Sequence, residues 1–158
     1  MITVVKKSTA FISILFLVFL TFVLVHKNQA IRVDTANDKI NKIVTIGGAD
    51  FSMRVVETET ERALGLSGTN SLGNRDGMLF IFPYSYQYGF WMKEMNYPLD
   101  IIWLDENHKI VTIRENLSPE TYPEIFYPEK KALYVVEVSA GTVKSLSLKV
   151  GDNIYFKR

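Results

Sequence analysis

Residues 77–105 read GMLFIFPYSYQYGFWMKEMNYPLDIIWLD, and this segment decides the predicted fold. Short apolar runs rich in β-branched and aromatic residues follow one another and are separated by prolines, a pattern typical of β-strands. Because proline cannot donate to a strand ladder, Pro83 and Pro98 are expected to bound these strands. Within the segment we predict strands at 78–82, 88–92 and 101–104.

Four charged residues, among them Glu94, stand in the same segment. Lys93, Asp100 and Asp105 lie within or beside its apolar runs. A charge is costly to bury unless a partner or hydrogen bonds compensate for the lost water. Residues 77–105 therefore also mark where we expect a functional site.

The remainder of the folded part is predicted to consist of strands with two short helices. Thr58 and Glu61 have the spacing of a capping box, which predicts a helix start. A second helix is expected at 140–148, with Ser139 as its N-cap. Further strands are predicted at 42–46, 51–56, 109–115, 132–138 and 153–156. About eight short strands and two small helices indicate a mainly β domain, a compact β-sandwich or barrel-like fold, at residues 43–158.

The N-terminal region predicts an attachment to the membrane. Residues 9–25, TAFISILFLVFLTFVLV, are 17 uncharged residues preceded by Lys6 and Lys7. As a helix this run spans about 26 Å, close to the roughly 30 Å of a bilayer core. We expect either a retained transmembrane anchor or a cleaved signal peptide.

The predicted topology follows from the basic residues before the apolar run. Residues 1–8 are expected in the cytoplasm, and a polar linker at 26–42 leads to an extracytoplasmic domain at 43–158. The chain would then be a single-pass protein of the cytoplasmic membrane with its C-terminal domain outside, or secreted if the signal is cleaved.

Composition narrows the classes of function. The net charge is +1, and the part that follows the N-terminal 30 residues is slightly acidic, which argues against nucleic-acid binding. The chain has no cysteine and only two histidines, so disulfides and a cysteine nucleophile are excluded. We predict neither a metal ion nor another cofactor.

Five blocks of sequence, taken in order, resemble the domain of unknown function 192 family. The resemblance covers nearly all of residues 43–158 and implies a compact, mostly β fold, but it implies no substrate, cofactor or reaction. The blocks are Glu57–Gly65, Gly77–Phe82, Phe90–Lys93 with Pro98–Ile101, Tyr134–Gly141, and Val150–Asp152.

The chain departs from the family pattern at two places. The helix usually continues with Gly-Leu-Met and a basic residue, whereas here it reads Gly65-Leu66-Ser67-Gly68. The lysine is usually followed by Asn and Thr, whereas Glu94 and Met95 follow Lys93 here. If the usual Asn-Thr pair contacts a ligand, this chain is expected to differ in ligand or affinity.

The candidate site residues are charged and aromatic residues of the matched blocks. We expect them to surround one concave polar-aromatic site that binds a polar small molecule, a saccharide or a peptide. The alternative for Lys93 is a structural ion pair with Asp100, Glu94 or Glu137. The predicted ligand-binding residues are Arg62, Trp91, Lys93, Asp100 and Glu137.

Two other functions remain open from the sequence. A hydrolase would need Asp100 and Glu137, or Asp105, to converge on one cleft. An envelope scaffold or protein-interaction domain would present a contiguous aromatic surface. The aromatic residues Tyr84, Tyr86, Tyr88 and Phe90 recur at every second position, which would place them on one face of a strand.

Overall fold

The computed structural model describes residues 41–157. The predicted anchor or signal peptide at 9–25 and nearly all of the predicted linker lie outside these residues. In the described part, no helix has the length and apolar character needed to cross a membrane.

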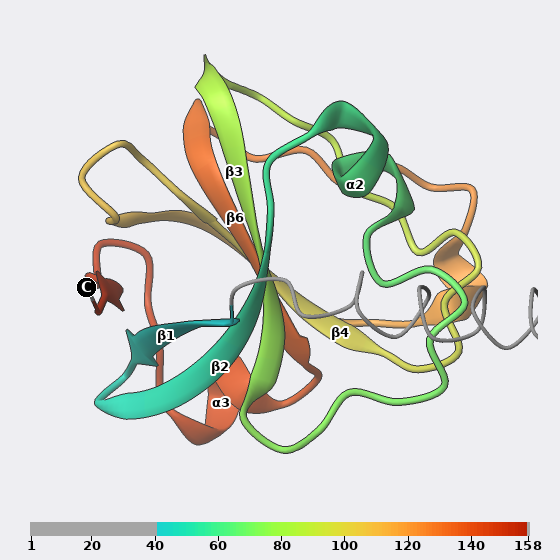
Figure 1. Cartoon of the computed structure of the whole chain (residues 1–158), viewed down its shortest axis with the longest axis horizontal. Coiled ribbons are helices and arrows are strands. Elements are labelled where there is room, and N and C mark those ends of the chain that lie inside the picture. The colour runs from blue at the N-terminus through green and yellow to red at the C-terminus, as the bar shows by residue number, and fades with distance from the viewer. Residues whose placement is uncertain (1–40, 158) are drawn as a thin grey trace, which may run out of the picture. The chain divides into compact units, whose positions relative to one another are not determined.

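The described residues form seven strands, two short α-helices and one turn of 3₁₀ helix (Figure 1). The strands are β1 (Asn41–Ile46), β2 (Ala49–Val56), β3 (Asp76–Tyr86), β4 (Leu99–Leu104), β5 (Ile110–Leu117), β6 (Ala132–Ser139) and β7 (Tyr155–Phe156). The helices are α2 (Glu59–Leu64), η1 (Pro119–Thr121) and α3 (Thr142–Ser145).

All seven strands belong to one sheet, in the order β5-β4-β6-β3-β2-β1-β7. Every neighbouring pair is antiparallel except β2 and β3, which are parallel. A parallel pair needs a long crossover, and here α2 and the loop after it supply one. The prediction of a mainly β domain with two short helices is confirmed. Of the two forms expected, the strands adopt a single curled sheet, or half-barrel, rather than two packed sheets.

Two predicted elements are wrong in detail. Residues 88–92 form no strand, and only Phe90 makes an isolated bridge, with Phe126. Pro83 does not end a strand but lies inside β3, where the pairing with β6 shifts register and β2 no longer pairs. A missing N–H is tolerated there because the ladder is already interrupted.

The start of the first helix was predicted correctly from the sequence, whereas the start and length of the second were not. The capping box at the start of α2 is confirmed, because Thr58 accepts from the Glu61 N–H and Glu61 accepts from the Thr58 N–H. The second helix is shorter than predicted, and its N-cap is Gly141 rather than Ser139.

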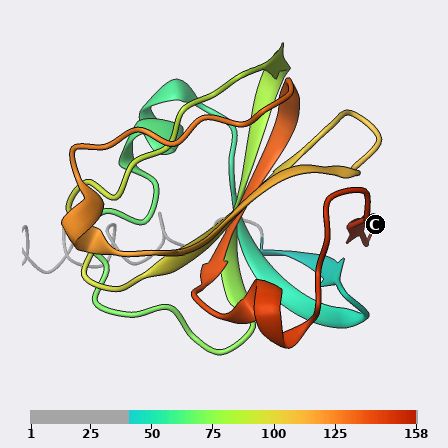
Figure 2. The same cartoon turned by 180° about the vertical axis from the view of Figure 1, so that it is seen from behind.

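Each face of the sheet carries its own hydrophobic cluster. One cluster includes Ile102, Val136 and Val138, and α3 packs against it through Val143. The opposite cluster includes Ile101, Trp103, Val135 and other large apolar residues, and it lies on the side of α2. Figures 1 and 2 show α2 and α3 well separated. Adjacent residues of one strand therefore belong to different clusters, as expected of the pleat.

Candidate ligand-binding cavity

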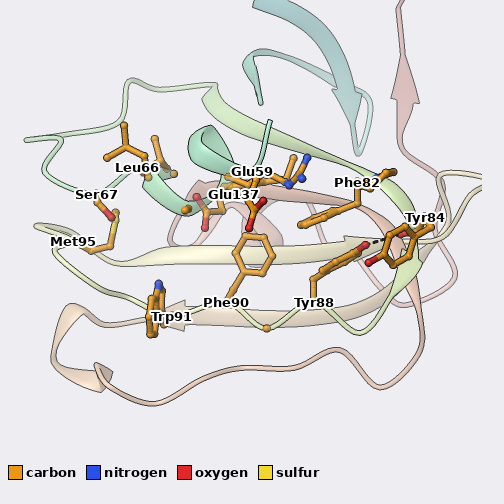
Figure 3. A pocket seen from close by; sticks show the side chains of 17 residues that line it. Glu59, Leu66, Ser67, Phe82, Tyr84, Tyr88, Phe90, Trp91, Met95 and Glu137 are labelled. Carbon is orange, nitrogen blue, oxygen red and sulfur yellow. Dashed lines mark hydrogen bonds between the residues drawn. The ribbon is translucent and has the colours of Figure 1, made fainter. Parts of the chain in front are cut away.

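A cavity of about 590 Å³ lies on the α2 side of the sheet. Its lining combines the sheet face, the helix with its following turn, and the loop after β3. In Figure 3, Tyr88, Phe90 and Trp91 line one side, and Glu59, Leu66 and Ser67 line the other. The volume lies within the range of cavities that hold small organic ligands. The lining residues are Glu59, Arg62–Ser67, Phe80, Phe82–Tyr84, Tyr88–Trp91, Met95 and Glu137.

Glu137 is the unusual residue of this cavity. It comes from the middle of β6, is 5% exposed and lines the cavity wall. Its Oε2 has no hydrogen-bond partner among the described residues. Buried polar atoms are nearly always paired, so an unpaired carboxyl oxygen in a cavity is a candidate contact for a ligand.

Burial raises the pKa of Glu137 from 4.5 to about 8, and the positive charge of Arg54 only partly opposes this shift. The strand register explains why Arg54 does not pair with Glu137. Met78 is the register partner of both Arg54 on β2 and Glu137 on β6, so it stands between them. Arg54 instead donates to the Gly65 carbonyl at 2.7 Å. At neutral pH the cavity therefore contains a carboxyl group that keeps its proton and can donate a hydrogen bond.

Arg62 supplies a positive charge at the same cavity. Its Nη1 donates to the carbonyls of Glu57 and, at 3.0 Å, Ile81. The guanidinium lies 4.9 Å from the ring centroid of Phe82, a cation–π contact. It forms no ion pair with a carboxylate of the described residues. Arg62 is thus held in place by neutral groups, and no acid among the described residues forms an ion pair with it.

Aromatic rings form the wall opposite α2. Tyr88 stacks on Phe82 with ring centroids 3.6 Å apart, and its hydroxyl donates to the Tyr84 carbonyl. Burial raises the pKa of Tyr88, so its hydroxyl stays neutral. Phe90 makes edge contacts with Phe80 and with the buried Trp103. These rings give the cavity flat apolar surfaces on which a planar group can stack.

The loop that carries this wall is fixed to β4 and to the loop between β5 and β6. Trp103 donates its Nε1–H to the Tyr88 carbonyl at 3.0 Å. Phe90 and Phe126 exchange backbone hydrogen bonds of 2.9 and 2.8 Å. A Cβ at Gly89 would lie 2.6 Å from Ile125, so only glycine allows this close approach. The loop is therefore a supported wall of the cavity.

Asp100 lies outside the cavity, on the other face of the sheet. It pairs in register with Val138, whereas Glu137 pairs with Ile101, and residues directly opposite each other share a face. Asp100 is fully buried, and its two oxygens accept from the backbone N–H groups of Asn116 and Val143, each at 2.8 Å. Its carboxylate joins a β5 bulge to the start of α3, and the predicted grouping of Asp100 with Glu137 is wrong.

The same register excludes a hydrolase based on Asp100 and Glu137, because two carboxylates on opposite faces cannot flank one bond. Asp105 does not replace Asp100. It accepts from the N–H groups of Asn107 and Lys109 in the turn after β4 and does not line the cavity.

Lys93 also lies outside the lining of the cavity. Its ammonium is 3.8 Å from Glu94 and 5.8 Å from the ring centroid of Trp91, and both charged side chains are largely exposed. Of the ion-pair partners considered above, the structure places Glu94 beside it. Such an exposed pair contributes little to stability.

The structure shows where Glu94 and Met95, which replace the usual Asn and Thr after the lysine, lie relative to the cavity. Glu94 has a φ of 56°, a left-handed conformation that asparagine adopts more readily than glutamate. The usual asparagine there is thus accounted for by backbone geometry. Met95, by contrast, lines the cavity, so the exchange of threonine for methionine makes the cavity less polar.

The structure brings together three of the five predicted site residues, Arg62, Trp91 and Glu137. Sequence reasoning missed Glu59, which lies one helical turn before Arg62. It also missed Phe80 and Phe82 as cavity residues, although their alternation in β3 was a usable signal. Among the described residues, no three His, Cys, Asp or Glu side chains are grouped to hold a metal ion.

Comparison with known proteins agrees with the family resemblance. The family model for DUF192, described as "Uncharacterized ACR", matches residues 42–156. A UPF0127 protein of Pyrococcus horikoshii is 30% identical over 107 residues, which is 65% of this chain and 84% of that protein.

Two solved structures share the fold. A protein of Sinorhizobium meliloti 1021, described as a candidate transcription regulator, superposes with a TM-score of 0.67 and 30% identity, covering 73% of this chain and 90% of that one. A protein of unknown function from Novosphingobium aromaticivorans DSM 12444 gives a TM-score of 0.66 and 27% identity, covering 72% and 81%.

Proposed function

Because the chain belongs to the DUF192 family, whose description assigns no activity, we propose from its own cavity that the domain is a binding module for a small organic ligand. The ligand has a flat or apolar body that stacks on the aromatic wall and an acceptor group that bonds to Glu137. Polar small molecules and saccharides with an apolar face both meet this description.

One observation carries this proposal. The carboxyl of Glu137 is buried, protonated at neutral pH and unpaired at Oε2, yet it lines a cavity large enough for a ligand. Leaving a buried polar group unsatisfied costs about 1–3 kcal/mol. A residue placed at such a cost in a cavity is explained if a ligand completes its hydrogen bonds.

Replacement of Glu137 by methionine tests the binding role. Methionine keeps the approximate size and apolar contacts of the side chain but removes the hydrogen bond. We expect ligands found by an NMR screen of saccharides and flat aromatic fragments to bind about ten-fold more weakly, the value of one hydrogen bond.

The matched control is Glu115→Met, on an exposed position of β5 away from the cavity. It should leave binding unchanged. The proposal fails if no compound shifts the amide signals of the cavity residues, or if Glu137→Met binds as tightly as the unaltered protein.

We also propose that the domain is tethered outside the cytoplasmic membrane by residues 9–25. The uncharged length of that run and the two lysines before it support this topology. In intact bacterial spheroplasts that express the full chain, added protease should digest the domain while a cytoplasmic marker survives. A domain that is digested only after lysis would reverse the orientation.

A further inference from the structure

We propose that the ligand of this cavity is a flat organic acid whose carboxylate binds Arg62. This inference rests on the proposed function and specifies the class of ligand. Three features of the cavity set the charge of the ligand: the charge of Arg62, the neutrality of Glu137 and the exposed position of Glu59 at the rim. The aromatic wall described above accounts for its flat shape.

The first feature is the state of Arg62. Its position is set by two backbone carbonyls and the face of Phe82, none of which neutralises its charge. A guanidinium presents a planar fork of donors that matches the two oxygens of a carboxylate. Because one guanidinium balances one negative charge, a carboxylate suits the site better than a phosphate, which carries nearly two.

The second feature is the absence of a competing anion deep in the cavity. Glu137 is the buried acid of the lining, and it is neutral at pH 7. It therefore does not repel an anionic ligand and instead offers a proton to an acceptor atom on it. A cationic ligand would have to lie beside Arg62, whose charge would repel it.

The third feature is the distribution of charge at the rim. Glu59 also lines the cavity and precedes Arg62 by one turn of α2, but no ion pair joins them. It is exposed, so its effect on a bound anion is a weak, screened repulsion. Arg62 thus attracts an anionic ligand and Glu59 weakly repels it, so replacement of the two residues should change the affinity for an anion in opposite directions.

Three indole compounds of one shape test the proposal: indole-3-acetate, indole-3-acetamide and tryptamine. Their negative, neutral and positive side chains share the same flat ring. Dissociation constants would be measured by NMR titration of the described domain's amide signals in the full-length protein in detergent. We expect indole-3-acetate to bind at least about ten-fold more tightly than the amide, since a charge-assisted pair exceeds a neutral hydrogen bond by this order. Tryptamine should bind most weakly.

Two variants locate the charge effect. Arg62→Gln should remove the preference for the acetate, and Glu59→Gln should tighten acetate binding while leaving the amide unchanged. If Arg62→Gln does not fold, as judged by its NMR spectrum, Glu59→Gln still decides the matter.

The inference is overturned if the amide or tryptamine binds as tightly as the acetate, or if a folded Arg62→Gln variant keeps the preference for the acetate. It is also overturned if Glu59→Gln leaves acetate binding unaltered at low ionic strength, where the repulsion by Glu59 is least screened. Binding of the amide without preference for the acetate would leave the proposed binding module standing and remove only the ligand class. Binding by none of the three overturns the inference for flat acids, and the wider screen then decides the proposed function.

Discussion

Glu137→Met is expected to make the domain more stable, and the gain should grow as the pH rises. The folded protein holds the Glu137 proton up to about pH 8, whereas the unfolded chain releases it near pH 4.5. Between these values the unfolded state binds fewer protons than the folded state, so the free energy of unfolding falls with increasing pH. The slope is about 1 kcal/mol per pH unit, and it accumulates to several kcal/mol across the window.

Urea unfolding of both proteins between pH 4.5 and pH 9 measures this effect. At low pH the free energy of unfolding of the variant should exceed that of the unaltered protein by only about 1–3 kcal/mol, the cost of the unpaired carboxyl. The difference should then widen up to about pH 8 and level off. Subtraction of the two curves cancels the other titrating groups, and Glu115→Met should show no such widening. A constant difference across the range would mean that Glu137 is already ionised in the folded protein.

Together with the weaker binding predicted for this variant, such a gain would separate function from stability. When a residue that stabilises the fold is replaced, the protein loses stability. A residue kept for a ligand can be removed with a gain in stability and a loss of affinity, because the folded state no longer carries its cost.

Asp100→Asn should have the opposite effect and destabilise the domain by about 3 kcal/mol or more, since each buried hydrogen bond to a charged group is worth about 1.5–3 kcal/mol. Asp100 accepts two backbone hydrogen bonds in a fully buried position. An asparagine can accept only one of them with its carbonyl, and its amide would face the other N–H donor. The bulge at Asn116 and the first turn of α3 should both loosen.

Asp105→Asn is a matched control for this substitution. Asp105 also accepts two backbone hydrogen bonds, but it does so in a solvent-accessible turn where water can replace them. We expect a loss of about 1 kcal/mol or less, within the usual range of surface substitutions. Equal losses for the two variants in urea unfolding would contradict the account of Asp100 as a buried structural carboxylate.

Much of the local structure was predictable because its causes are local. The capping box of Thr58 and Glu61 lies within four residues, and it starts α2 as expected. The strands with dense β-branched residues, such as β4 and β6, were recognised for the same reason. The predicted strand at 88–92 failed because Gly89 packs against Ile125 and Tyr127, a contact between segments far apart in sequence.

The candidate site was only partly predictable. Arg62, Trp91 and Glu137 were identified as charges and an aromatic residue in distinctive blocks, and they share the cavity. Asp100 was identified by the same reasoning, but it lies on the other face. In β6 the residues 135–138 are buried on both sides, so the sequence pattern contains no sign of which face opens to a cavity.

The sequence by itself determined the family, the mainly β class, the cap of α2 and the presence of charges among apolar strands. These features depend on neighbouring residues and on patterns of period two. Only the tertiary structure decided what each charge does. The register of β4 against β6 sends Asp100 and Glu137 to opposite faces, and packing covers the Asp100 side while α2 leaves space beside Glu137. Desolvation, which gives Glu137 its proton at neutral pH, is a property of that packed environment.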